Sequence, residues 1–426
     1  MNCVKDFFEF VRSAPTAYHT VDSVKKALLE AGYTELFETD AWELSVGGKY
    51  FVTRNGSSII AFRKGGDEDG FAIAASHTDF PTFRLKSNPT LDSAGCTIVP
   101  LEKYGGMINY TWFDRPLSVA GRVMVRTGEG VEARLVNVER DLVVIPSVAI
   151  HLSRNVNTNF APTLTEDIRP ILSAKEGASL GAIIAGELGV SEEDIVSSDL
   201  FVYVREEGRV FGAEGELMLS PRIDNLTSVY ESLNAFLSSD DIVMTPVLAA
   251  FDNEEVGSDT KQGAASTFLS DVLERIAGGR RNLRRALATS FMISADNAHA
   301  IHPNHPELSD KGNAPKLMGG VVIKHSANQK YTTDALSEAI FKTLAADAGI
   351  VCQHYHNRSD MIGGSTLGSI ATTKVSVSTV DVGIPQLAMH SAVECAAYKD
   401  ALDLGRVISR LYSAKISIKG KNFVIK

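Results

Sequence analysis

The chain has 426 residues, of which 44% are hydrophobic and 22% are charged, and its formal net charge is -10. A chain of this length usually divides into two domains, each with a core of its own. The acidic balance argues against a nucleic-acid-binding surface, which needs clustered lysine and arginine, and no apolar run in the sequence approaches the length that spans a bilayer.

The cysteines are sparse and widely spaced. They are Cys3, Cys96, Cys352 and Cys395. This spacing indicates neither a disulfide framework nor a thiolate metal site and suits a reducing compartment. Residues 1–12 mix charges with apolar residues, unlike a signal peptide. We therefore expect a cytoplasmic protein that binds neither nucleic acid nor a membrane.

The first part of the chain has the pattern of an α/β unit. Residues 3–31 have apolar residues at helical spacing with a break around Pro15. Three short strand-like runs follow, at 48–54, 57–63 and 71–76. We assign residues 1–85 to the first part of a catalytic α/β domain.

The texture changes over residues 86–214, where short alternating runs lie between Gly and Pro turns, as in a β-rich module. One helix is expected within it, at 178–189. The α/β pattern resumes over residues 215–426. The sequence therefore predicts a mixed-sheet α/β/α domain that is interrupted by an inserted β-rich domain.

Two adjacent glutamates follow a short buried strand. Glu254 and Glu255 follow the apolar run at 245–251, separated from it by Asp252 and Asn253. A buried pair of carboxylates is costly unless a cation compensates one or a proton neutralises it. A metal ligand beside a general base satisfies both conditions. The alternative is a solvated acidic turn.

Other strand ends carry similar side chains. His77 and Asp79 lie two residues apart at a strand end, so both can point to one side, and a metal-bound histidine commonly donates its second nitrogen to a carboxylate or backbone acceptor. A structural hydrogen-bonding role is the alternative for His77. Asp224 precedes a helical stretch and is either a helix cap or a metal ligand.

Five strand-end positions together form a candidate metal set. They are His77, Asp224, Glu254 with Glu255, Asp296 and His390. If they meet at one sheet edge, they supply enough ligands for two divalent ions with a bridging carboxylate. An oxygen and nitrogen set without thiolate suits zinc, manganese or cobalt.

Several motifs resemble one known family. They are Ser-His-Thr-Asp at 76–79, Pro-Arg-Ile-Asp-Asn at 221–225, Asp-Asn-Glu-Glu-Val-Gly-Ser at 252–258, Asp-Asn-Ala-His-Ala-Ile-His-Pro at 296–303 and Met-His-Ser at 389–391. The chain resembles the aspartyl aminopeptidases, which are dinuclear metallo-aminopeptidases. The likeness runs over nearly the whole length and includes residues 111–117 and 149–152 of the expected insertion.

The resemblance implies a role for each candidate. One ion would be held by His77, Asp224 and Asp296, and the other by Asp224, Glu255 and His390. Asp224 would bridge the two ions, Glu254 would be the general base and Asp79 would orient the site. The implied cofactors are two divalent ions, with zinc first and manganese or cobalt as alternatives.

The resemblance also implies where the substrate binds. Lys324, at the end of the run 319–324, would receive the acidic side chain of the first residue of a peptide, although a solvated lysine is the alternative. His151 is by its surroundings a core histidine, but the family places it in the active site of a neighbouring subunit. His299 and Tyr331 are further candidates for substrate contacts. The insertion would form a dimer, and the assembly would be a dodecamer.

The chain departs from the family pattern at three positions. Ser369 stands where proline is expected, Asn297 where methionine is commoner, and His325 lies beside Lys324. The last departure bears on how strict an acidic preference would be. Two other functions stay open: a related enzyme that removes neutral residues or an acyl group, and an assembly-forming scaffold with a vestigial site.

Overall fold

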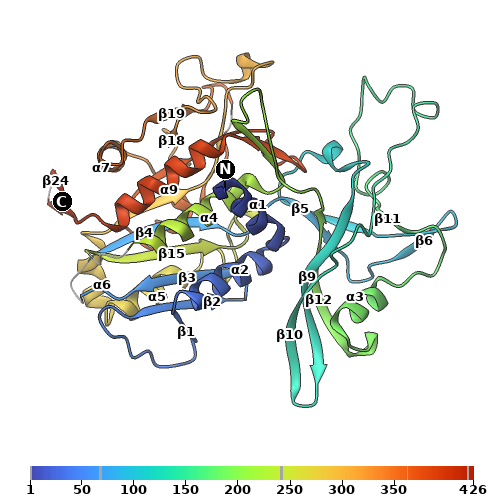
Figure 1. Cartoon of the computed structure of the whole chain (residues 1–426), viewed down its shortest axis with the longest axis horizontal. Coiled ribbons are helices and arrows are strands. Elements are labelled where there is room, and N and C mark those ends of the chain that lie inside the picture. The colour runs from blue at the N-terminus through green and yellow to red at the C-terminus, as the bar shows by residue number, and fades with distance from the viewer. Residues whose placement is uncertain (1, 67–69, 240–242, 362, 420–421) are drawn as a thin grey trace.

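The computed structural model describes residues 2–66, 70–239, 243–361, 363–419 and 422–426. Within them, a nine-stranded mixed sheet forms the centre of the larger domain (Figure 1). In spatial order its strands are β1 (Thr34–Leu36), β2 (Lys49–Arg54), β3 (Ser58–Arg63), β15 (Thr245–Phe251), β4 (Phe71–His77), β16 (Phe291–Ala295), β20 (Ser378–Gly383), β18 (Val321–His325) and β19 (Cys352–His356). The run from β15 to β20 is parallel.

Helices cover both faces of this sheet. One face packs against α1 (Asn2–Ser13), α2 (Ala17–Glu30), α4 (Ile223–Ser238), α7 (Ala335–Asp347) and α9 (Tyr398–Tyr412). The other packs against α5 (Phe268–Ile276), α6 (Arg280–Leu287) and α8 (Leu367–Ala371). Successive residues of β4 alternate between the two cores, with Ala72 and Ala74 in one and Ile73 and Ala75 in the other. The predicted α/β/α architecture is confirmed.

A smaller sheet lies beside the carboxyl ends of the central strands. Among the described residues it has the order β13 (Arg209–Phe211), β14 (Leu217–Ser220), β22 (Glu394–Ala396), β21 (Pro385–Leu387) and β17 (Ala298–His299). The last strands of the chain, β23 (Ile416–Lys419) and β24 (Asn422–Ile425), form a separate hairpin.

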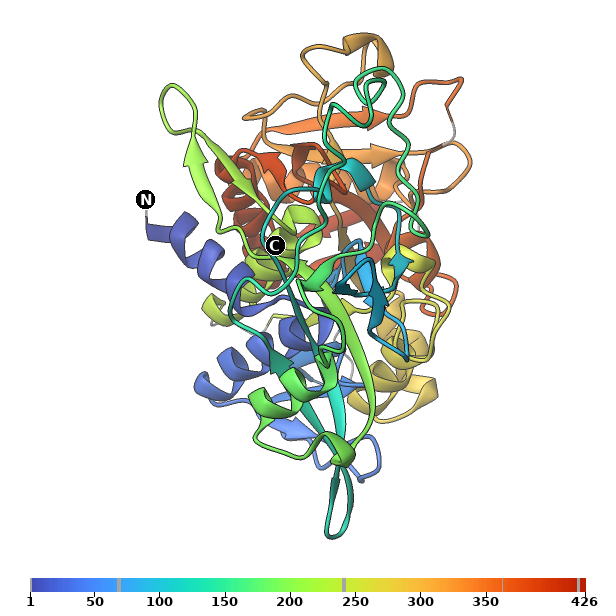
Figure 2. The same ribbon diagram turned by 90° about the vertical axis from the view of Figure 1, so that its right-hand side faces the viewer.

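The β-rich module lies to one side of the larger domain, on the right of Figure 1. Its larger sheet has the order β10 (Gly130–Asn137), β9 (Leu117–Thr127), β12 (Ile195–Val204), β5 (Thr82–Leu85) and β8 (Leu101–Tyr104). Beside it are β11 (Ile171–Ser173), β7 (Cys96–Ile98), β6 (Leu91–Ser93) and α3 (Leu180–Leu188). Strands β9 and β10 extend as a long hairpin (Figure 2). The module has its own core.

The sheet of the module begins at β5, a few residues before the domain limit that the sequence predicts at residue 86. The limits of the two domains stay a prediction. Two helices begin later in the chain than the sequence predicts. The apolar periodicity of residues 329–349 predicts a helix there, but α7 begins only at Ala335, because Asp334 and Ser337 form a capping box. The sequence also predicts a C-terminal helix from residue 392 to about residue 414, but α9 begins at Tyr398, because β22 pairs with β14 and β21 first.

Several elements of the larger domain lie outside the sequence expectations, and two of them bear on the central sheet. Helix α6 separates α5 from β16, and β19 adds an edge strand beside β18. In the described part of the chain, no helix is both long and apolar enough to cross a membrane. The three cysteines whose side chains are described, Cys96, Cys352 and Cys395, are free thiols.

Candidate metal centre

Three neighbouring parallel strands end at one edge of the central sheet, and each end carries an ionisable side chain. Strand β4 ends at His77, β15 leads into the short helix η3 (Glu254–Val256), and β16 ends one residue before Asp296. The carboxyl ends of parallel strands lie at one edge, which is where α/β sheets present functional groups. For these positions the placement is the one predicted.

Asp224 and His390 reach the same place from the smaller sheet, so the expectation that all candidates share one sheet edge is wrong for these two. Asp224 lies near the start of α4, where its backbone is not helical (φ −83°, ψ 110°), and among the described residues its carboxylate accepts no backbone N–H, so it does not cap the helix. His390 lies between β21 and β22. Glu394 on β22 holds both, because its carboxylate accepts the backbone N–H of Asp224 at 2.9 Å and of His390 at 2.7 Å.

Two imidazoles face the two different oxygens of the Asp224 carboxylate. His77 Nε2 lies 3.6 Å from Asp224 Oδ1 and 3.5 Å from Asp296 Oδ1. His390 Nε2 lies 3.5 Å from Asp224 Oδ2 and 3.3 Å from Glu255 Oε1. Ligand atoms around a tetrahedral zinc ion with bonds of about 2.0–2.1 Å lie about 3.3 Å apart. Each triad therefore has the spacing of ligands around one ion, and Asp224 belongs to both triads.

The electrostatics of this cluster also fit divalent cations. Asp224 is 3% exposed, and among the described residues its Oδ1 atom has no hydrogen-bond partner. Burial would raise the pKa of Asp224, but the imidazoles of His390 and His77 outweigh it and lower that pKa. Burial raises the pKa of Glu255 as well. A buried carboxylate without hydrogen bonds is costly, and a bound cation removes that cost.

Glu254 lies beside the two triads. Its carboxylate is grouped with the ligand atoms of His77 and Glu255, within 4.8 Å of one another. Burial raises the pKa of Glu254 well above its ordinary value, and the nearby imidazole of His77 opposes that shift. A carboxyl group whose pKa is raised is suited to accept and return a proton near neutral pH.

Asp79 accepts hydrogen bonds from the site through both its backbone carbonyl and its side-chain carboxylate. The Nδ1–H of His77 donates to the backbone carbonyl of Asp79 at 3.0 Å, which leaves Nε2 to face the carboxylates. The Asp79 carboxylate accepts the backbone N–H groups of Glu254 and Glu255 at 3.1 Å each, and the hydroxyl of Tyr104 at 2.7 Å. Asp79 therefore orients both the imidazole and the loop that carries the glutamates.

Lys324 is 2% exposed, so the alternative of a solvated lysine is wrong. Its Nζ donates to Asp296 Oδ2 at 3.0 Å and to the backbone carbonyl of Asn297 at 2.9 Å. The ammonium lies 5.3 Å from the centroid of the Tyr331 ring. Burial would lower the pKa of Lys324, but the charge of Asp296 outweighs it, so that pKa lies above its ordinary value.

A cavity of about 310 Å³ adjoins the centre. His299, Tyr355 and Met389 are among the residues that line it, and Met389 precedes the candidate ligand His390. The exposed ring of His299 packs edge-on against Tyr355, with centroids 6.0 Å apart. Tyr331 is buried beside Lys324 and is not among the residues that line this cavity.

His151 lies on the inserted module and is exposed, so it is not a core histidine. Two of the three positions that depart from the family pattern have local hydrogen-bond partners. The buried Asn297 amide donates to the backbone carbonyl of Ile223 at 3.0 Å and to Gln386 Oε1 at 2.7 Å. Ser369, in α8, donates to the backbone carbonyl of Thr366 at 3.0 Å.

Three contributions to the site are absent from the sequence expectations: Glu394, Tyr104 and Gly106. The last two come from the end of β8 in the inserted module. The Nδ1–H of His390 donates to the Gly106 carbonyl at 2.6 Å. Gly105 has a φ of +79°, and a Cβ on it would lie 3.1 Å from the Glu255 Cβ. The Gly-Gly pair after a strand is the signal that could have revealed this close approach.

Comparisons with known proteins identify the family of the chain. Residues 10–412 match the model of a family described as aminopeptidase I zinc metalloprotease (M18). A probable M18 family aminopeptidase 2 of Clostridium acetobutylicum is 44% identical over 424 residues, which cover 96% of this chain and 98% of the relative. A protein of the same description from Pseudomonas paraeruginosa is 37% identical over 416 residues, covering 95% of this chain and 97% of the relative.

Solved structures give the same result. A chain of the cryo-EM structure of the Ape4 and Nbr1 complex superposes with a TM-score of 0.93 at 36% identity, covering 96% of this chain and 85% of that chain. The mApe1 dodecamer of S. cerevisiae gives 0.83 at 25% identity, with 96% and 97% covered. The predicted fold and enzyme class are thereby confirmed, and the chain belongs to the M18 family of zinc metallo-aminopeptidases.

Proposed function

We propose that this aminopeptidase removes N-terminal Asp or Glu from peptides at a centre of two divalent cations, with zinc favoured and manganese or cobalt as alternatives. His77, Asp224 and Asp296 would hold one ion, and Asp224, Glu255 and His390 the other. The observation that carries the proposal is the Asp224 carboxylate, whose two oxygens face two different imidazoles at 3.6 Å and 3.5 Å.

The roles of the residues follow from their positions. Two bound cations supply Lewis-acid activation of a water molecule and of the scissile carbonyl. Glu254 accepts the proton of the attacking water and returns it to the leaving amine. Asp79 holds the backbone of Glu254 and Glu255 at 3.1 Å, which keeps the base aimed at the reacting atoms.

The acidic preference is proposed from Lys324. An ammonium has three N–H donors, and Asp296 and the Asn297 carbonyl accept two of them. Among the described residues no further acceptor lies within hydrogen-bond distance of Nζ, so we propose that the third N–H serves a substrate carboxylate. A charge-assisted hydrogen bond to a buried ammonium is stronger than one between neutral groups, so Asp or Glu at the first position would be favoured. His299, on the adjoining cavity, is proposed as a further substrate contact, with Tyr331 supporting the ammonium.

We also propose that the chain assembles through its inserted module, as a dodecamer. Large apolar side chains are exposed together on one irregular segment of the module, and they are Val148, Ile150, Leu152 and Phe160. Leu152 is 84% exposed. Contiguous exposed apolar residues commonly mark interfaces, and the S. cerevisiae relative is a dodecamer. His151 lies within this segment and would contact the centre of a neighbouring subunit. A cytoplasmic location stays a prediction.

A substrate panel tests the proposed reaction. Protein reconstituted with Zn²⁺, Mn²⁺ or Co²⁺ is assayed on peptides that differ only in an N-terminal Asp, Glu, Asn, Gln or Leu. We expect release of Asp and Glu, loss of activity with a chelator, and recovery with metal. Equal release of neutral residues, or cleavage of acyl groups alone, would support the neutral-substrate alternative. No cleavage with any metal would reject the proposal.

Mixed assemblies test the role of His151. His151→Ala and Glu254→Gln are each expected to be nearly inactive alone. If His151 acts on a neighbouring subunit, co-assembly of the two variants restores part of the activity, because some centres then combine an intact Glu254 with an intact partner His151. A mixture that regains nothing after confirmed subunit exchange would contradict a contribution across the interface.

A further inference from the structure

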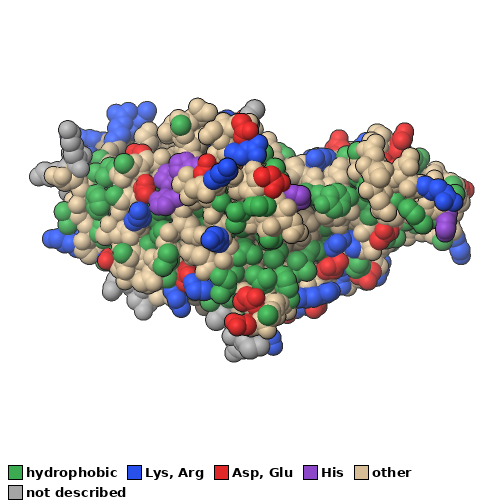
Figure 3. All heavy atoms as spheres, turned by 90° about the horizontal axis from the view of Figure 1, so that it is seen from above, with side chains coloured by type: hydrophobic (Ala, Val, Ile, Leu, Met, Phe, Trp, Pro, Cys, Tyr) green, Lys and Arg blue, Asp and Glu red, His purple; other side chains and the backbone are tan. Residues whose placement is uncertain are grey.

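A second group of imidazoles lies at the outer edge of the central sheet, away from the proposed centre. His325 ends β18, His354 and His356 lie on the edge strand β19, and Glu338 lies in the first turn of α7. Because side chains alternate along a strand, His325 lies on the face opposite to Lys324. Figure 3 shows histidine side chains gathered in an exposed patch over the part of the molecule where β18 and β19 lie.

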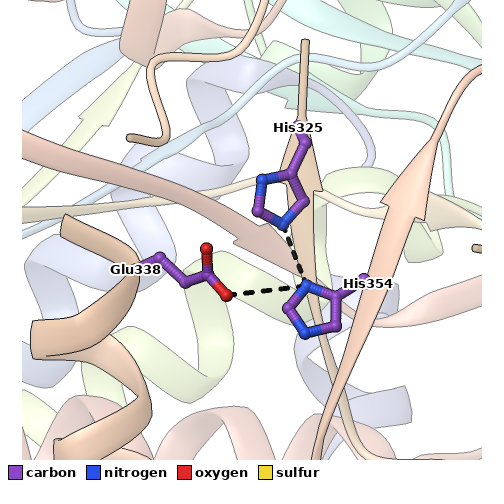
Figure 4. A group of neighbouring side chains, drawn as sticks. All are labelled: His325, Glu338 and His354. Carbon is purple, nitrogen blue, oxygen red and sulfur yellow. Dashed lines mark hydrogen bonds and ion pairs between the residues drawn. The ribbon is translucent and has the colours of Figure 1, made fainter. Parts of the chain in front are cut away.

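The potential ligand atoms converge on one point. His325 Nε2 lies 2.9 Å from His354 Nδ1, and Glu338 Oε1 lies 3.8 Å from the same His354 nitrogen (Figure 4). The ligand atoms of His325, Glu338 and His354 all lie within 4.8 Å of one another. The ring of His356 stacks on His325, with centroids 4.8 Å apart and an interplanar angle of 6°, which holds the His325 ring in place.

We propose that His325, Glu338 and His354, the edge cluster, form an additional site for one divalent transition-metal ion of the zinc class, separate from the catalytic centre. Two imidazoles and one carboxylate are a set that binds zinc while a fourth position takes water. The ligands come from β18, α7 and β19, so a bound ion would tie the edge strand to its neighbour and to a helix.

The surrounding charges permit this. Burial lowers the pKa of His325, and the charge of Glu338 only partly opposes that shift, so a neutral ring with a free lone pair is favoured. Without an ion, the two facing nitrogens share one proton in a hydrogen bond. Lys342 competes for the site, because its Nζ lies 3.6 Å from Glu338 Oε1. That ammonium is half exposed, and exposed ion pairs are weak enough to be displaced.

The position of the edge cluster gives it a consequence for the enzyme. Lys324 immediately precedes His325 on β18. An ion at the edge cluster would restrain the end of the strand that carries Lys324, and would thereby hold the ammonium against Asp296. This consequence rests on the proposed role of Lys324 in substrate binding, whereas the metal site itself does not.

Metal counting tests the site without relying on activity. Wild-type protein, His354→Asn and the control His305→Asn are saturated with Zn²⁺, freed of excess by gel filtration and analysed for zinc per chain. His305 is an exposed histidine that also contacts a glutamate, at 3.2 Å, but lies outside the edge cluster. We expect His354→Asn to retain one zinc ion fewer than wild type or His305→Asn, and calorimetric titration to show at least tenfold weaker binding of that ion.

A second variant guards against misfolding. Glu338→Gln keeps the shape of the side chain but removes its charge, so it should fold and also lose the additional ion. Equal zinc content and affinity in wild type, His354→Asn and Glu338→Gln would overturn the proposal, as would an equal loss in His305→Asn. If wild type has this zinc ion but does not prefer acidic substrates, the proposed acidic preference fails while the edge cluster stands.

Discussion

The proposed catalytic centre and the edge cluster both combine imidazoles with carboxylates beside the central sheet, but His77 and Asp224 of the centre are buried more deeply than the edge cluster. In the centre, the side chains of His77 and Asp224 are 1% and 4% exposed. In the edge cluster, those of His354 and Glu338 are 35% and 25% exposed. Water can therefore satisfy the polar atoms of the edge cluster, whereas the Asp224 Oδ1 atom depends on its neighbours alone.

The two regions also differ in charge. Burial would lower the pKa of both His77 and His390, but ion pairs with Asp224 and other carboxylates outweigh it. The pKa of His77 therefore lies well above its ordinary value, and that of His390 rises to about 12. Burial lowers the pKa of His325. In the metal-free centre the imidazoles of His77 and His390 are therefore protonated, whereas a neutral ring is favoured for His325 of the edge cluster.

The largest effect is expected from Glu254→Gln. Loss of the base should lower kcat by about 10³-fold, within the range typical of general base catalysis. The metal content should be unchanged, because Glu254 is not one of the proposed ligands. The control is Glu307→Gln, which removes an exposed glutamate outside both clusters. Full activity in Glu254→Gln would break the assignment of the centre.

The next effect is the pH dependence of metal binding. His77 and His390 have raised pKa values, so both are protonated at neutral pH in the metal-free protein and must lose a proton to bind an ion. Each ion should therefore bind about tenfold more tightly for each unit of pH increase near neutrality.

Calorimetry in buffers of different ionisation enthalpy measures this release. About one proton per ion is expected from the catalytic centre, and fewer from the edge cluster, where the pKa of His325 is lowered. Equal proton release per bound ion in wild type and in a variant that lacks His77 and His390 would contradict the predicted difference in proton release between the two regions.

Lys324→Met should have an intermediate effect. A lost charge-assisted hydrogen bond of about 2 kcal/mol corresponds to roughly a 30-fold lower kcat/KM for peptides that begin with Asp or Glu. Peptides that begin with Leu should change much less. Because Lys324 also contacts Asp296, the metal content is measured in parallel. An equal loss on acidic and neutral substrates would assign Lys324 to holding Asp296 alone.

Tyr104→Phe should have the smallest effect. It removes a hydrogen bond of 2.7 Å to the Asp79 carboxylate, which is worth about 1 kcal/mol or roughly a fivefold decrease in kcat. Tyr110→Phe, at an exposed tyrosine of the same module, is the matched control. If both variants behave alike, the hydrogen bond from Tyr104 to Asp79 contributes nothing to activity.

The sequence predicts the positions in the centre that depend on local patterns. A buried strand followed by His77, by two glutamates or by Asp296 can be recognised from apolar runs, because parallel strands present their carboxyl ends together. The sequence identifies Asp224 and His390 as candidate ligands but assigns them to the edge of the central sheet. They lie by the smaller sheet instead, which forms from strands such as β14 and β22 that are far apart in the sequence. Pairing between such distant short strands leaves no local signal.

The remaining contributions depend on tertiary contacts. Glu394 positions two distant segments through backbone N–H groups, and the carbonyl of Gly106 could come from any residue type. The burial of Lys324 likewise follows from the packing of Tyr331 and Asp296 around it. Of the edge cluster, the sequence analysis notes only His325, as the neighbour of Lys324. It does not predict strand β19, which brings His354 beside His325.

The most direct test of the account is anomalous diffraction at the zinc absorption edge from crystals of the zinc-loaded protein. We expect two peaks that flank the Asp224 carboxylate, one near His77 and Asp296 and the other near His390 and Glu255. A single peak that contacts only one imidazole, or no peak beside Asp224, would contradict a dinuclear centre built on this shared carboxylate.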